Sequence, residues 1–87
     1  MPHQLDIVYF SWVKERLGRA QETVVCPETV HTIGELIGSL KASDALYQDV
    51  FSDLKKLRFA LDQDFVGLDA PLGNAKELAI FPPVTGG

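Results

Sequence analysis

Hydrophobic and polar residues alternate near the start of the chain, from Leu5 to Phe10. In an extended segment, Leu5, Ile7 and Tyr9 fall on one face, and Val8 and Phe10 fall on the other. β-Branched and aromatic side chains are typical of strands. The pattern therefore predicts a central strand here.

Later segments have the same β-type composition, and turn residues or prolines bound them. Proline lacks the N–H group that a sheet ladder needs, so it ends a strand. Asp62-Gln63-Asp64 is typical of the turn between two hairpin strands. The expected strands are residues 22–26 before Pro27, residues 57–61 and 65–66 in the hairpin, and residues 77–81 before Pro82.

The main helix is expected to begin after Thr32. Thr32 and Glu35 match the capping box, in which each side chain binds the free backbone N–H of the other residue. Apolar residues then follow at helical spacing as far as about Ala42, and they form one stripe. These residues are Ile33, Leu36, Ile37 and Leu40.

Two less regular helical segments are expected on either side of the main helix. Residues 12–17 predict a short helix, with Ser11 as its N-cap and Gly18 where it stops. Apolar residues continue at helical spacing over residues 43–54, but the pattern is less regular, so helical or irregular structure is expected there. The sequence thus predicts an α+β fold, in which a mixed sheet packs on one main helix.

Composition and charge limit the class of protein and its partners. The chain has 87 residues, of which 46% are hydrophobic and 23% are charged, so we expect a single domain with one core. Its net charge of -4 argues against nucleic acid and favours a basic protein partner. The apolar runs are too short to span a membrane and no signal pattern begins the chain, so a cytoplasmic protein is expected.

Few side chains of this sequence could carry out chemistry or bind a metal. Cys26 ends a valine-rich strand and is expected to be a small buried hydrophobe rather than a sulfur handler. The Cys and His residues lack zinc-ligand spacing, so no metal site is expected. Lys55, Lys56 and Arg58 form the only basic cluster, which we expect to be a solvated face.

The C-terminal segment, IFPPVTGG, is the most informative part of the chain. Pro82 and Pro83 favour a stiff exit from the sheet, whereas Gly86 and Gly87 allow close approach from all sides. Six residues from Pro82 onward can reach roughly 20 Å, at about 3.3 Å per residue. The sequence therefore predicts a domain over residues 1–81 and a flexible tail over residues 82–87.

The only charge after Glu77 is the terminal carboxylate of Gly87. A carboxylate is a poor electrophile, so it must first be converted into a species with a good leaving group, such as an acyl-adenylate made from ATP. The chain has neither an ATP-binding loop nor a constellation of catalytic side chains, so a partner must supply the activation. The alternative is that the two glycines are incidental.

These residues resemble a known family, the small, sulfur-carrying subunit of molybdopterin synthase. The resemblance covers nearly the whole chain, from Val8-Tyr9-Phe10 to Gly87, and FPPVTGG is its most specific part. It implies the ubiquitin-like β-grasp fold. Relatives commonly have Asn in place of Asp62, and because Asp also tolerates turn geometry we expect no loss of function.

The resemblance also implies a mechanism. An adenylating enzyme related to ubiquitin-activating enzymes would consume ATP to activate the Gly87 carboxylate, and a sulfur donor protein would then make it a thiocarboxylate. The Gly86-Gly87 tip would enter the large synthase subunit and pass sulfur to cyclic pyranopterin monophosphate. This chain would bind no cofactor and would not be catalytic alone, since the catalytic side chains belong to the large subunit. The implied assembly has two small and two large subunits.

The family docks its partners through an apolar sheet surface, and the matching residues here are Phe10, Phe65 and Phe81. A strand phenylalanine is more often part of the core, so full burial of all three would contradict the docking role. The tail residues expected to contact partners are Pro82, Pro83, Val84 and Thr85.

Two other functions remain open from the sequence. The chain could be a sulfur carrier for another pathway, such as thiamine synthesis or tRNA thiolation. It could also be a β-grasp interaction module or protein modifier whose tail is incidental or becomes isopeptide-linked.

Overall fold

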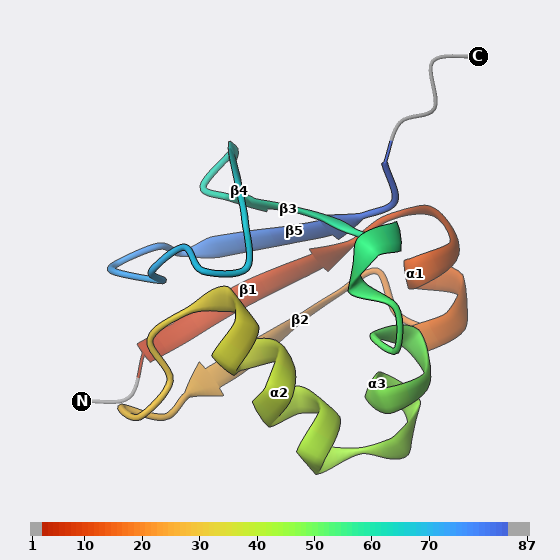
Figure 1. The fold of residues 1–87 in the computed structure, drawn as a ribbon, viewed down its shortest axis with the longest axis horizontal. Helices are drawn as coiled ribbons and strands as arrows, with labels where there is room; N and C mark the ends of the chain where they lie inside the picture. The colour runs from red at the N-terminus through yellow and green to blue at the C-terminus, as the bar shows by residue number, and fades with distance from the viewer. Residues whose placement is uncertain (1–2, 84–87) are drawn as a thin grey trace.

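The computed structural model describes residues 3–83, which form one mixed sheet with helices on one side (Figure 1). Its elements, in chain order, are β1 (His3–Tyr9), α1 (Ser11–Leu17), β2 (Gln21–Cys26), α2 (Ile33–Ser43), α3 (Ala45–Val50), the 3-10 helix η1 (Leu54–Lys56), β3 (Arg58–Leu61), β4 (Asp64–Val66) and β5 (Glu77–Phe81). The strand order is β2-β1-β5-β3-β4. Only the β1–β5 pair is parallel among these strands. The predicted α+β sheet on one main helix is confirmed.

The predicted first strand is confirmed as β1, which lies between β2 and β5. Leu5 and Ile7 are fully buried and Tyr9 is almost so, as the alternating pattern requires. Their face is the one that α2 covers (Figure 1). Because these side chains leave water on folding, they supply a large share of the apolar contribution to the free energy of unfolding.

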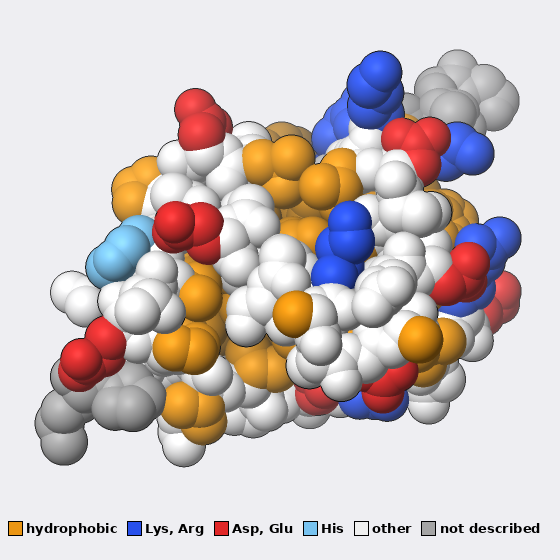
Figure 2. Space-filling view, turned by 60° about the horizontal axis from the view of Figure 1, so that its bottom comes forward, with side chains coloured by type: hydrophobic (Ala, Val, Ile, Leu, Met, Phe, Trp, Pro, Cys, Tyr) orange, Lys and Arg blue, Asp and Glu red, His pale blue; other side chains and the backbone are white. Residues whose placement is uncertain are grey.

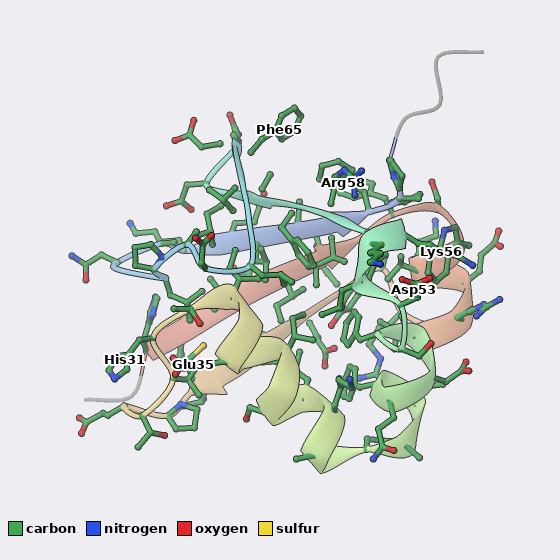
Figure 3. All side chains as sticks on the ribbon, in the orientation of Figure 1. His31, Glu35, Asp53, Lys56, Arg58 and Phe65 are labelled. Atoms are coloured by element: carbon green, nitrogen blue, oxygen red, sulfur yellow. The ribbon has the colours of Figure 1, made fainter. Side chains whose placement is uncertain are left out.

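The capping box at the start of α2 is confirmed. The Thr32 hydroxyl accepts a hydrogen bond from the Glu35 N–H at 3.1 Å, and the Glu35 carboxylate accepts from the Thr32 N–H at 3.1 Å. The same carboxylate accepts from the backbone N–H of His31 at 2.8 Å, at the helix end labelled in Figure 3. The predicted apolar stripe of α2 is buried and consists of Ile33, Leu36, Ile37 and Leu40.

The structure corrects the expected start of α1. Gly18 ends this helix as predicted, with a left-handed φ of 74° that glycine adopts without steric cost. However, Ser11 is not its N-cap, because the chain turns out of β1 one residue earlier. Phe10 holds the extended cap position and its side chain makes no capping hydrogen bond, and Ser11 is the first residue of the helix, with φ 55°.

Residues 43–54, expected to be helical or irregular, are both. Asp44 is extended and separates α2 from α3, and its carboxylate caps α3 by accepting from the Leu46 N–H at 2.8 Å. Asp53 caps η1 in the same way, by accepting from the Lys55 N–H at 3.2 Å. The helical spacing is therefore interrupted at Asp44 and Asp53, where each aspartate side chain accepts a hydrogen bond from a backbone N–H.

The hairpin between β3 and β4 is confirmed, but its turn is shorter than predicted. Asp64 pairs with Leu61, so the turn consists of Asp62 and Gln63 alone, both with positive φ. This geometry matches the right-handed twist of the two strands. The Asp62 carboxylate also accepts from the N–H groups of Lys76 and Glu77, each at 3.0 Å. It thereby fixes the start of β5.

Replacing Asp62 tests this contact. Asp62→Ala removes both hydrogen bonds and a residue that tolerates positive φ, so we expect the free energy of unfolding to fall by about 1–2 kcal/mol. Asp62→Asn keeps an acceptor oxygen and the turn preference, and should change it by no more than about 0.5 kcal/mol. Urea unfolding measures both values. Equal losses in the two variants would show that the acceptor oxygen is unimportant.

A cluster of polar side chains closes the core beneath the end of β1. The hydroxyl groups of Tyr9 and Tyr47 donate to the same Glu22 oxygen, at 2.5 and 2.6 Å. Arg19 donates to the other Glu22 oxygen at 3.0 Å. The cluster therefore joins β1, β2, α3 and the turn after α1 through one carboxylate.

These contacts shift the pKa values of the cluster. Burial alone would raise the pKa of Glu22, but hydrogen bonds from Tyr47 and Tyr9 and the Arg19 charge outweigh it and leave this pKa below its ordinary value of 4.5. Burial, followed by the bond to Glu22, raises the pKa of Tyr47 to about 12. Burial likewise raises the pKa of Tyr9. The folded state thus favours a charged Glu22 and neutral tyrosines.

Acid should therefore weaken the fold through Glu22. Because the folded-state pKa is lowered, the unfolded chain binds more protons in acid, so this stability is present above the ordinary value of 4.5 and is lost as the pH falls through the lowered pKa. Glu22→Gln should lower the free energy of unfolding by about 1–3 kcal/mol at pH 7 and lose less between pH 5 and 2. Urea unfolding across this range measures both effects, with Glu15→Gln as the control. If Glu22→Gln and wild type lose stability in parallel, the cluster does not hold the carboxylate charged.

Candidate functional site

One face of the sheet carries no helix in the described part of the chain, and we call it the open face (Figure 1). Ala60 of β3 lies opposite Phe65 of β4 and Ala79 of β5, and Arg58 lies opposite Phe81. Alternate strand residues point to opposite faces, so these five residues share the open face. Their neighbours in sequence, such as Phe59 and Ile80, are buried in the core.

The three phenylalanines predicted to dock partners are not fully buried. Phe65 is 84% exposed, Phe10 is 47% exposed, and Phe81 is half-buried. The rings of Phe65 and Phe81 lie together, with centroids 5.8 Å apart. Full burial of all three phenylalanines would have contradicted the docking role, and they are not fully buried. The docking role itself stays a prediction.

A hollow of about 390 Å³ lies beside these rings. Among the described residues, its lining is apolar apart from Arg58, and it consists of Phe59, Phe65, Val66, Phe81 and Pro83. In Figure 3, Phe65 and Arg58 project on the side of the sheet opposite α2. Because Pro83 is the last described residue, the hollow lies next to the root of the tail.

The sheet fixes where the tail leaves. Phe81 ends β5 and lies opposite Arg58 on β3, while Ile80 lies beside Tyr9 on β1. The Phe10 N–H donates to the Ile80 carbonyl at 3.2 Å. Strands on both sides of β5 therefore hold its end, and the half-buried Pro82 and Pro83 continue from a defined position.

The tip of the tail lies outside the described residues. The predicted site residues Val84, Thr85, Gly86 and Gly87 belong to this part of the chain. The division into a domain over residues 1–81 and a flexible tail over residues 82–87 therefore stays a prediction.

Other candidate groups offer little chemistry. Cys26 is buried, as predicted, and burial raises the pKa of its thiol, so the reactive thiolate is disfavoured. Over residues 3–83, no group of three or more His, Cys, Asp or Glu side chains could hold a metal ion. Within that same range, no helix is long and apolar enough to cross a membrane.

Sequence reasoning missed two parts of this site. Ala60 and Ala79 lie side by side on the open face, next to the phenylalanines in the strand register. Lys55, Lys56 and Arg58 are exposed, as predicted for a solvated face, but Arg58 also lines the hollow. The alternation over residues 57–61 indicated which side Arg58 faces. It did not indicate which strands lie beside it, because strand order depends on the whole fold.

Sequence comparison finds relatives of matching length. A protein from Dictyostelium discoideum is 32% identical over 89 residues, and the match covers 100% of both chains. A protein from Escherichia coli is 33% identical over 84 residues, with 95% of this chain and 99% of the relative covered. Both are named molybdopterin synthase sulfur carrier subunit.

Solved structures share the fold at lower sequence identity. The small archaeal modifier protein 1 of Haloferax volcanii matches with a TM-score of 0.75 at 18% identity, covering 94% of this chain and 99% of that one. A ubiquitin from Caldiarchaeum subterraneum matches with a TM-score of 0.59 at 13% identity, covering 100% of both chains. These neighbours confirm the predicted ubiquitin-like β-grasp fold.

A family model matches residues 7–87, which is nearly the entire chain and includes every element from within β1 onward. Together with the two full-length relatives, this match confirms the family resemblance that the C-terminal motif suggested. The chain belongs to the ThiS family.

Proposed function

We propose that this protein is the sulfur carrier subunit of molybdopterin synthase. The observation that supports it most directly is the full-length similarity to two relatives of that name. A tail root held by strands on both sides, beside exposed phenylalanines, suits a chain that docks through its open face and presents its C-terminus.

The chemistry takes place at the terminal carboxylate of Gly87. An adenylating enzyme joins this carboxylate to AMP from ATP and releases pyrophosphate. Sulfide-level sulfur supplied by a donor protein then attacks the acyl carbon, so that a C–S bond replaces the C–O bond to AMP and a thiocarboxylate is left. In the large subunit, this sulfur bonds to cyclic pyranopterin monophosphate, water cleaves the acyl–sulfur bond, and Gly87 returns to a carboxylate.

Because other proteins carry out the chemistry at Gly87, the proposed function implies specific partners. The large subunit supplies the catalytic side chains, and the complex contains two small and two large subunits. Phe10, Phe65 and Phe81 contact the partner, whereas the residues from Pro82 to Gly86 enter its active site. This chain binds neither the ATP nor a cofactor itself, and it donates sulfur without being catalytic alone.

Intact-mass measurement tests the carrier function. The chain is incubated with ATP, the adenylating enzyme of the same organism and a sulfur source. We expect a gain of about 16 Da, because one sulfur atom replaces one oxygen atom. A variant lacking Gly87 is the control and should gain nothing. No gain in the native chain, or an equal gain in the truncated one, would contradict the proposal.

A second measurement separates the pathways. The thiocarboxylated chain is mixed with the large subunit and cyclic pyranopterin monophosphate, and molybdopterin is measured. Product formation supports the molybdenum pathway. A thiocarboxylated chain that yields no product would indicate instead a carrier for thiamine synthesis or tRNA thiolation.

Replacing Phe65 tests docking through the open face. Phe65→Ser should weaken binding to the large subunit about 10- to 100-fold, because buried aromatic anchors often supply about 1.4–3 kcal/mol of binding free energy. The fold should tolerate the change, since this side chain is 84% exposed. Val25→Ser, a control at the far end of β2 with 58% exposure, should bind as wild type does. Calorimetric titration gives both affinities, and equal affinities would rule out Phe65 as an anchor.

A further inference from the structure

We propose that the hollow beside the tail root recognises an acidic side chain of the partner together with an apolar neighbour, and that Arg58 binds the carboxylate. The expected ligand is therefore a partner segment in which Asp or Glu adjoins an aromatic or aliphatic residue. The identity of the partner rests on the proposed function, but the chemistry of the hollow does not.

The guanidinium of Arg58 is already held in place. Its Nη1 donates to the backbone carbonyl of Leu57 at 2.8 Å and to that of Lys55 at 3.1 Å. An arginine that is fixed before binding loses less conformational entropy when a ligand arrives. Its Nε and Nη2 atoms still carry N–H donors, which can bind a carboxylate through paired hydrogen bonds.

Among residues 3–83, no acidic side chain lines the hollow, and Arg58 is the only charged residue that does. The ion pairs found in the same range are Arg16 with Asp49 and Arg19 with Glu22, and neither involves Arg58. Lys55 and Lys56 precede it in η1 and add positive charge. In Figure 2, Lys and Arg side chains lie mainly on the right half of the view, toward the end of the molecule where β5 finishes, with Asp and Glu side chains among them. The positive charge beside the tail root thus comes from Arg58 together with Lys55 and Lys56.

The other surface hollow near η1 lacks this preference. It measures about 270 Å³ and is lined by charges of both signs, with Arg16 and Lys56 opposed by Asp49 and Asp53. Figure 3 shows Lys56 and Asp53 on the same side of η1. Opposed charges give little net attraction for a ligand of either sign. Of these two hollows near η1, the one that contains Arg58 therefore favours an acidic group.

The apolar lining determines the second half of the ligand. The rings of Phe65 and Phe81 form one wall, and Val66 and Pro83 contribute aliphatic surface. A volume of about 390 Å³ is near the lower end of the roughly 300–1,000 Å³ that small-molecule sites occupy, so it suits one or two side chains. A carboxylate next to an apolar side chain would satisfy the guanidinium and cover the rings at once.

A small probe tests the hollow without any partner. The isotope-labelled full-length chain is titrated with N-acetylphenylalanine, which has a ring and a carboxylate, and separately with its uncharged amide. NMR spectra are recorded at each step. We expect the carboxylate to bind at least about 10-fold more tightly, with chemical shift changes centred on Arg58, Phe65 and Phe81. Equal affinities, shifts centred elsewhere, or no shifts up to the solubility limit would overturn the proposal.

Matched variants assign the preference to Arg58. Arg58→Gln should abolish the preference for the carboxylate, whereas Lys76→Gln, with the same change of charge at the opposite end of β5, should retain it. With the large subunit, Arg58→Gln should weaken binding at least about 10-fold relative to Lys76→Gln. Equal binding by the two variants would overturn the proposal while leaving the carrier function intact. If even the native chain fails to bind the large subunit, the proposed function fails, and the probe titration still decides the chemistry of the hollow.

Discussion

The placement of β5 between β1 and β3 is the constraint on which the rest of the structure depends. The last strand of the described chain is central in the sheet, with a parallel neighbour on one side and an antiparallel neighbour on the other. β5 joins the β1–β2 pair to the β3–β4 pair, so the five-stranded sheet is complete only when this strand is in place. As a result, the tail leaves from a position that two other strands determine, and Asp62 holds the opposite end of β5.

The two faces of the sheet have different roles. The helix-covered face holds the core, and every buried polar side-chain atom of the described residues has a hydrogen-bond partner, including the Glu22 cluster. The open face presents Phe65 and Phe81 beside Arg58. Stability therefore depends mainly on one face, and a partner can be recognised on the other without disturbing the core.

The sequence predicted those features that depend on near neighbours. β1 and α2 were predicted correctly because the alternation of apolar and polar residues and the capping box at Thr32 are local patterns. The burial of one face of each element agrees with these patterns. Ser11 was misplaced because the position of a cap depends on where the preceding strand ends. The Glu22 cluster joins residues 13 and 25 positions apart, so only strand register and the packing of α3 bring them together. For the same reason, Arg58 could be placed on a face but not beside Phe81.

The most direct test of this account is a cross-saturation experiment on the isotope-labelled chain bound to the large subunit of molybdopterin synthase. Saturation passes from the unlabelled partner only to nearby amides, so it maps the contact surface. Among residues 3–83, docking through the open face predicts the strongest transfer over residues 58–66 and 77–83, and little over α2. Transfer centred on α2, with the open face unaffected, would contradict it.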